Sequence, residues 1–185
     1  MAPLLAASLA VAQAASPAPP SANPQPSIPL GTVEGWGLYD NIGDCSILTE
    51  YESGAYLRVA YEYGENRAWF SIDNPAWRSI EQGRQYQIGV FFSNGAQYGP
   101  VGAFGMNSVY EGARMTGLLA IFHAEDFLRD FAESASIVVT MDEARLGAVA
   151  LEGTRAAVAR LRTCALDTHR RNPPDPAANL PPPRK

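Results

Sequence analysis

The chain contains two cysteines, Cys45 and Cys164, which stand near the two ends of the one stretch that has the composition of a folded domain. In an oxidising compartment such a pair is expected to form a disulfide. A bridge that closes a loop of roughly 120 residues contributes about 4–5 kcal/mol to stability in the chain-entropy model. The placement therefore predicts an exported single domain that is clasped by a Cys45–Cys164 bond.

The first residues agree with export. Leu4 to Val11 form an apolar run that is too short to span a bilayer, and Ala12-Gln13-Ala14 behind it matches the small-x-small pattern of a cleavage site. No Lys or Arg precedes the run, which departs from the usual signal. We expect a signal peptide over residues 1–14 and a periplasmic or secreted protein. No other segment is long enough for a membrane span, so an integral membrane protein is not expected.

Proline use predicts the domain boundaries. Seven of the fifteen prolines fall in residues 1–30 and six in residues 173–185, which leaves only Pro75 and Pro100 between them. Segments rich in Pro, Ser and Ala have little to bury and are typical of linkers. The sequence predicts a linker over residues 15–31, one domain over 32–166, and a disordered Pro-rich tail over 167–185.

Charge excludes one class of partner. Residues 32–166 contain 17 acidic residues against 10 arginines and no lysine, whereas residues 167–185 carry a net charge of +2. An acidic domain repels phosphate backbones, and nucleic-acid binding depends on clustered basic side chains. We therefore expect no nucleic-acid partner.

The first half of the domain has the pattern of short strands joined by turns. Residues 33–39, 45–51, 55–63, 68–73 and 85–93 alternate apolar and polar side chains, and glycine-containing or polar segments separate them. Five strands with such short connections predict an antiparallel meander.

The second half changes period. Residues 124–133 place Phe127, Leu128 and Phe131 on one helical face, with acidic residues in the first turn. Residues 136–141 and 146–151 predict a hairpin, and a last helix is expected to begin at Thr154 as N-cap and to turn Cys164 inward. The predicted fold is α+β: an antiparallel sheet, made of the five-strand meander and the C-terminal hairpin, with two helices packed on it.

Two segments carry a resemblance to a known group of proteins. The run from Trp77 to Tyr86 and the closing run from Leu151 to Cys164 resemble a pattern found in small exported alphaproteobacterial domains of unknown function. The resemblance implies an exported bacterial domain with a cysteine clasp, and it implies no catalytic residues.

Motifs for chemistry are weak. His123 stands beside Glu125 and Asp126, but a zinc site needs three or four ligands and the other histidine, His169, lies in the expected tail. The glycines between Gly99 and Gly105 lack the lysine of a phosphate-binding loop, which favours a glycine-rich loop or a distorted strand. No serine stands in a nucleophile elbow. We expect no metal, no cofactor and no catalytic residue that the sequence can name.

One segment has the composition of a binding surface. Between residues 93 and 111, Tyr98, Phe104 and Tyr110 alternate with glycines. Aromatic rings on a long loop suit a protein or polysaccharide partner of the cell envelope, whereas the alternative is that the rings complete the core. We expect an exported non-catalytic binding or interaction module, an inhibitor or accessory factor of the envelope. The alternatives are an envelope hydrolase that uses a carboxylate pair and a structural spacer module.

Overall fold

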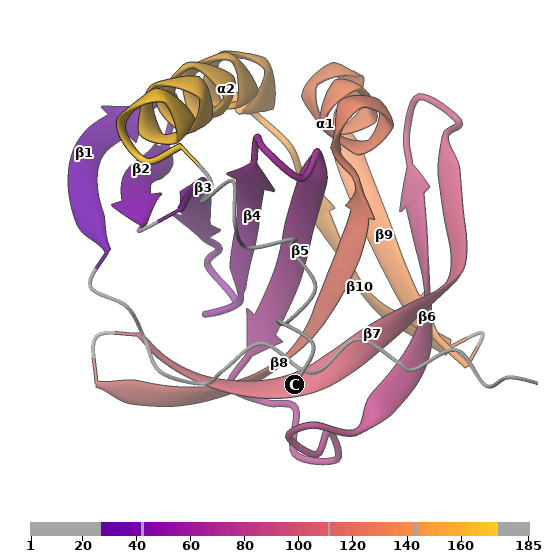
Figure 1. The fold of residues 1–185 in the computed structure, drawn as a ribbon. Helices are drawn as coiled ribbons and strands as arrows, with labels where there is room; N and C mark the ends of the chain where they lie inside the picture. The colour runs from indigo at the N-terminus through magenta and orange to yellow at the C-terminus, as the bar shows by residue number, and fades with distance from the viewer. Residues whose placement is uncertain (1–26, 42, 111, 143, 174–185) are drawn as a thin grey trace, which may run out of the picture.

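The computed structural model describes residues 27–173 apart from residues 42, 111 and 143, and it shows one curled antiparallel sheet of ten strands with two helices (Figure 1). The strand order is β1-β2-β3-β4-β5-β8-β7-β6-β9-β10. The first five strands are β1 (Ile28–Val33), β2 (Trp36–Asn41), β3 (Asp44–Glu50), β4 (Tyr56–Glu62) and β5 (Arg67–Asn74). The other elements are β6 (Gln85–Phe92), β7 (Gln97–Tyr110), β8 (Ala113–His123), α1 (Ala124–Glu133), β9 (Ser136–Met141), β10 (Ala144–Ala150) and α2 (Thr154–Arg171).

The α+β class, the antiparallel sheet and the two helices are confirmed, whereas the number of strands is not. The expected strand 33–39 is wrong, because Val33 ends β1 and Trp36 begins β2. Glu34 and Gly35 between them both have positive φ angles, 48° and 84°. Two consecutive residues with positive φ form the turn that joins the tightest hairpins. A glycine inside an apparently alternating run therefore marks a hairpin here.

The expected fifth strand also has different neighbours from those of a simple meander. β6 pairs with β7 and β9, and the neighbour of β5 is β8. β7 and β8 were not predicted as regular strands, because β7 is rich in glycine and residues 118–122 of β8 are apolar on both faces. Without alternation, the sequence carries little strand signal there.

The helices fill one side of the curled sheet (Figure 1). α1 spans the predicted residues 124–133, and its Phe127, Leu128 and Phe131 are fully buried. In α2, Cys164 is buried as predicted, and Leu161 is buried beside it. Thr154 is the first helical residue and not the N-cap, since Gly153 precedes the helix with a φ of 74° and the Thr154 hydroxyl donates to the Leu151 carbonyl.

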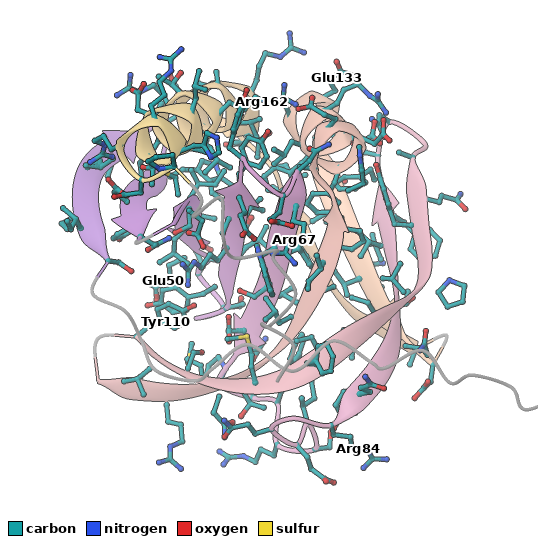
Figure 2. The ribbon with its side chains drawn as sticks, viewed as in Figure 1. Glu50, Arg67, Arg84, Tyr110, Glu133 and Arg162 are labelled. Carbon is teal, nitrogen blue, oxygen red and sulfur yellow. A yellow bond between two sulfur atoms is a disulfide. The ribbon has the colours of Figure 1, made fainter. Side chains whose placement is uncertain are left out.

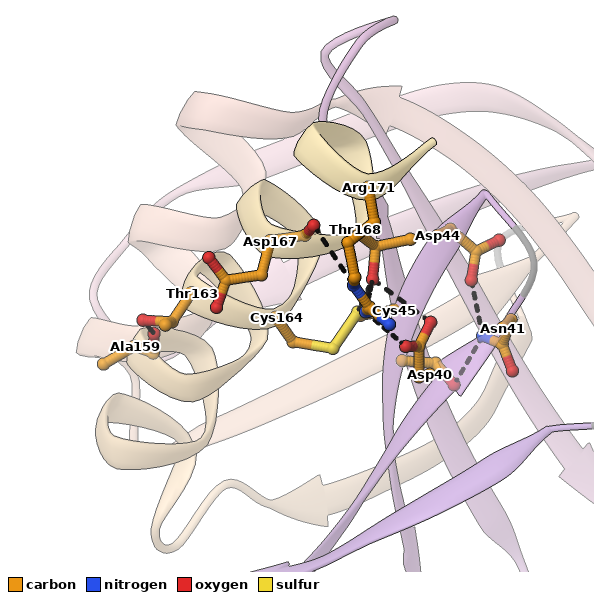
Figure 3. Close-up of a disulfide and its surroundings, with 11 residues drawn as sticks. Asp40, Asn41, Asp44, Cys45, Ala159, Thr163, Cys164, Asp167, Thr168 and Arg171 are labelled. Atoms are coloured by element: carbon orange, nitrogen blue, oxygen red, sulfur yellow. Dashed lines mark hydrogen bonds and ion pairs between the residues drawn. A yellow bond between two sulfur atoms is a disulfide. The ribbon is translucent and has the colours of Figure 1, made fainter. Parts of the chain in front are cut away.

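The predicted clasp is present. Cys45 of β3 and Cys164 of α2 form a disulfide with 6.0 Å between their Cα atoms (Figure 3). Thr168 contacts the Cys45 sulfur at 3.4 Å and donates to an Asp40 carboxylate oxygen at 3.1 Å. Arg171 donates to the other Asp40 oxygen at 2.6 Å. The bond and these contacts join the end of α2 to β2 and β3.

Both terminal elements reach beyond the range expected for the domain. β1 begins at Ile28, inside the expected linker, and α2 continues to Arg171, inside the expected tail. The expected signal peptide, residues 15–26 of the linker and residues 174–185 of the tail lie outside the described residues. None of the described helices is both long and apolar enough to cross a membrane.

Candidate functional site

Alternation along β4 and β5 separates two faces of the sheet. Leu57, Val59 and Phe70 point to the helices and are fully buried. Successive side chains of a strand point to opposite faces, and paired residues share a face. The side chains that alternate with them form what we call the outer face: Asp44 and Glu50 of β3, Tyr56, Arg58, Ala60 and Glu62 of β4, Arg67, Trp69, Ser71 and Asp73 of β5, and Tyr110 of β7.

A buried carboxylate lies at one end of the outer face. Asp73 has no exposed surface, although it points away from the helices. Ser108 of β7 donates to one carboxylate oxygen at 2.7 Å, and the Tyr110 hydroxyl donates to the other at 3.4 Å. Gly117 of β8 permits this reach, because a Cβ at that position would lie 2.4 Å from the Asp73 oxygen. The long β7–β8 hairpin thus covers this end of the face (Figure 1).

The surroundings of Asp73 favour its protonated form. Burial raises the pKa of the Asp73 carboxyl, because the charged form loses hydration. The hydrogen bonds from Ser108 and Tyr110 and the charge of Arg58 oppose that shift and do not cancel it. The same neighbourhood raises the pKa of Tyr110, first through burial and then through the charge of Asp73. The tyrosine hydroxyl therefore stays protonated and keeps its donor role.

The raised pKa predicts a dependence of stability on pH. Between the ordinary value of 3.8 and the higher folded value, the folded state holds the extra proton. The contribution of Asp73 to folding stability is therefore fully present below its pKa in the unfolded state. This contribution is lost as the pH rises through its pKa in the folded state. Asp73→Asn should remove this dependence, so urea titrations should show wild type gaining stability relative to the variant between about pH 7 and about pH 4. A constant difference would contradict the prediction, and Asp142→Asn, at an exposed site, is the control.

A stacked pair of rings lies beside this carboxylate. The rings of Tyr56 and Tyr110 are nearly parallel, with centroids 4.4 Å apart and planes at 7°. Tyr110 comes from the end of β7, whereas Tyr56 begins β4, opposite Glu50 of β3. Figure 2 shows Tyr110 and Glu50 close to the β7–β8 hairpin. Both tyrosines are half-buried, so part of the pair remains open to solvent.

The other end of the outer face is organised by an ion pair. Arg67 donates twice to one Glu62 oxygen, at 3.1 and 2.9 Å, and the Trp69 indole nitrogen donates to the same oxygen at 3.4 Å. The Arg67 guanidinium also lies 5.7 Å from the centre of the Trp69 ring. These contacts fix a half-buried tryptophan on the same face as the tyrosine pair.

The structure does not bring the three predicted aromatic residues together. Tyr110 lies on the outer face, but Tyr98 packs on the helix side against the rings of Phe92, Phe122 and Phe127. The Tyr98 hydroxyl donates to Asp130 of α1. Tyr98 is therefore partly buried and packs against the core.

Phe104, the third predicted aromatic residue, lies apart from the tyrosine pair. Phe104 is half-buried, and it lies on the same side of the sheet as Ser71 but two strands away. Tyr56, Trp69 and Asp73 were not predicted as site residues. The alternation of side chains in the predicted strands 55–63 and 68–73 could have identified them, because it places these residues on one face of the sheet.

The weak chemical motifs have structural roles. His123 joins β8 to α1, contacts the Asn66 amide at 3.0 Å and lies 3.8 Å from Asp126. The glycine-rich segment is part of strand β7, and a Cβ at Gly105 would lie 2.1 Å from the Glu81 carbonyl. Close backbone packing therefore requires that glycine. Within residues 27–173, leaving out the three undescribed positions, no three His, Cys, Asp or Glu side chains are placed to hold a metal.

Two hollows lie away from the outer face. One, of about 190 Å³, lies beside the disulfide, where Asp40 and Arg171 pair with each other. The other, of about 310 Å³, lies between α1 and α2, and Arg129 and Arg162 at its rim pair with acidic residues of α1. The cations named at both hollows are thus neutralised by the protein itself.

Comparisons of the chain with protein-family models, with curated proteins and with solved structures find no match. The resemblance to exported alphaproteobacterial domains therefore stays a prediction.

Proposed function

We propose that the protein is an exported, non-catalytic binding module and that it binds its partner on the outer face of β4 and β5. The observation that carries the proposal is the Tyr56–Tyr110 pair, held in place beside the buried Asp73. Rings that are half-open to solvent but fixed by neighbours offer contact area at a low cost in side-chain entropy. A surface of this kind suits recognition.

A polysaccharide of the cell envelope suits this surface best. Sugar rings present apolar faces that stack on aromatic side chains, and their polar edges need hydrogen-bonding groups nearby. The outer face combines three rings, Tyr56, Tyr110 and Trp69, with polar side chains of both charges. A small number of placed polar groups beside apolar rings is typical of small-molecule and sugar sites.

Binding agrees with the site better than hydrolysis does. A hydrolase of the expected kind needs a carboxyl of raised pKa that reaches its substrate. The pKa of Asp73 is raised, but its carboxyl has no exposed surface and accepts hydrogen bonds from Ser108 and Tyr110. Burial raises the pKa of Asp44 as well, and its carboxyl accepts a hydrogen bond from the Asn41 amide. Asp73 is thus placed to hold Tyr110, and the tyrosine pair is the part that a partner reaches.

Sedimentation with insoluble polysaccharides tests the proposal. The purified full chain should be retained by at least one of peptidoglycan sacculi, chitin or cellulose, and Tyr110→Ala should weaken retention about thirtyfold or more, as for a central aromatic contact. Tyr63→Ala is the matched control, because Tyr63 is exposed and contacts His169 and not the outer face. Circular dichroism should show that both variants are folded. Equal retention of wild type and Tyr110→Ala would contradict the proposal.

A further inference from the structure

Arg58 differs from every other arginine that the structure describes. It is half-buried at the middle of the outer face, opposite Leu48 of β3 and Ser71 of β5. Of the half-buried arginines, Arg67 pairs with Glu62 and Arg162 with Glu125. Within the described ranges, Arg58 alone combines partial burial with the lack of any hydrogen bond or close ion pair to another described residue. Among the described residues, none accepts a hydrogen bond from any of its five N–H donors.

The charges around Arg58 oppose an anionic ligand. Asp73, Asp44 and Tyr110 interact with the Arg58 charge, but neither carboxylate is within ion-pair distance of it. Glu62 already neutralises Arg67. With Asp44 and Glu50 of β3, which lie on the same side of the sheet, the outer face carries four acidic and two basic groups. Burial raises the pKa of both Asp44 and Asp73, so an anionic ligand that approached Arg58 would either be repelled by these two carboxylates or require them to bind protons.

A hydroxyl group can form hydrogen bonds both with the Arg58 guanidinium and with the carboxylates around it. It accepts a hydrogen bond from a guanidinium and donates one to a carboxylate at the same time, whereas a carboxylate or phosphate only accepts. The planar fork of an arginine can donate to two oxygens at once, and adjacent hydroxyls of a sugar ring present two acceptor oxygens. Arg58 stands two residues along β4 from Tyr56, on the same face as the stacked rings. Ring stacking and donation to hydroxyls can therefore act on one sugar.

From these contacts we infer that the ligand of the outer face is an uncharged, hydroxyl-rich glycan, and that Arg58 donates to its hydroxyl oxygens. The inference rests on the proposed function and adds the chemical class of the ligand. It excludes acidic glycans as the preferred ligand of the same surface.

Calorimetric titration of the full chain with defined oligosaccharides tests this. The uncharged probes are hexamers of β-1,4-linked N-acetylglucosamine, glucose and mannose, and the acidic probe is hexagalacturonate. At least one uncharged hexamer should bind, its affinity should change little between low and high salt, and hexagalacturonate should bind more weakly than that hexamer. Arg58→Gln should weaken binding about tenfold to a hundredfold, because a charged donor is lost.

Two variants sharpen the result. Arg58→Lys keeps the charge but loses the planar fork, so it should weaken binding of an uncharged glycan as Arg58→Gln does. Arg78→Gln, at an exposed position outside the outer face, should leave binding unchanged. Melting temperatures should confirm that the variants are folded.

The outcomes separate the inference from the proposed function. Tighter binding of hexagalacturonate that high salt abolishes and that Arg58→Lys retains would overturn the inference and leave the binding face in place. Retention by insoluble polysaccharide that depends on Tyr110, with no binding of any uncharged hexamer, would overturn it as well. Loss of any dependence on Tyr110 would instead contradict the proposed function.

Discussion

Replacing both cysteines by alanine should lower the free energy of unfolding by about 4–5 kcal/mol. Cys45 and Cys164 are 119 residues apart in the chain, so the bond removes a large amount of conformational freedom from the unfolded state. It also joins β3 to α2, whose last turns contact Asp40 through Thr168 and Arg171. Chemical denaturation of wild type and of the double variant under non-reducing conditions measures the difference.

The double variant is preferable to a single one, because a single substitution leaves a reactive thiol. Native wild type should also react with no thiol reagent until it is denatured and reduced, since the described residues include no free cysteine. A loss of less than about 1 kcal/mol, or two titratable thiols in the native protein, would contradict the role of the clasp.

Phe127→Ala should lower the free energy of unfolding by about 3–5 kcal/mol. Phe127 of α1 is fully buried, and its ring contacts those of Phe70, Phe92 and Phe122. Truncation removes the buried surface of one ring and leaves a cavity among the others, which the rigid strands close only in part. Urea denaturation measures this effect.

Phe91→Ala is the matched control for Phe127→Ala. Phe91 is the neighbour of Phe92 on β6, but 38% of it is exposed. Its truncation should cost less than about 1 kcal/mol, as is usual for surface positions. Equal losses for the two substitutions would mean that α1 is not packed against the sheet as the structure shows.

Local signals predicted the two helices and the strands over residues 45–51, 55–63 and 68–73. α1 follows from the spacing of Phe127, Leu128 and Phe131, because helical period and buried face coincide there. The pairing of strands depends on contacts between distant segments, so local sequence patterns did not predict it. β5 pairs with β8 across a gap of almost forty residues, and nothing in the local pattern of either strand identifies its neighbour.

In the candidate site as well, local sequence patterns predicted some residues but not the contacts between distant strands. Tyr110 was predicted as a site residue because it is an aromatic residue in a glycine-rich segment. Its partners were not, because Tyr56 and Asp73 lie in other strands and meet Tyr110 only when the β7–β8 hairpin crosses the end of the sheet. Tyr98 had the same local signal as Tyr110, yet it packs beside Phe127. Local composition therefore identifies candidate rings and does not assign them to a face.

NMR spectroscopy tests whether the ligand binds on the outer face. The isotopically labelled full chain would be titrated with the hexasaccharide that binds best, and the shifted backbone amides would be mapped on the structure. We expect the largest shifts to cluster at Tyr56, Arg58 and Tyr110 on the outer face. Shifts that cluster instead at Leu128, Arg155 and Val158, which line the hollow between α1 and α2, would contradict this expectation.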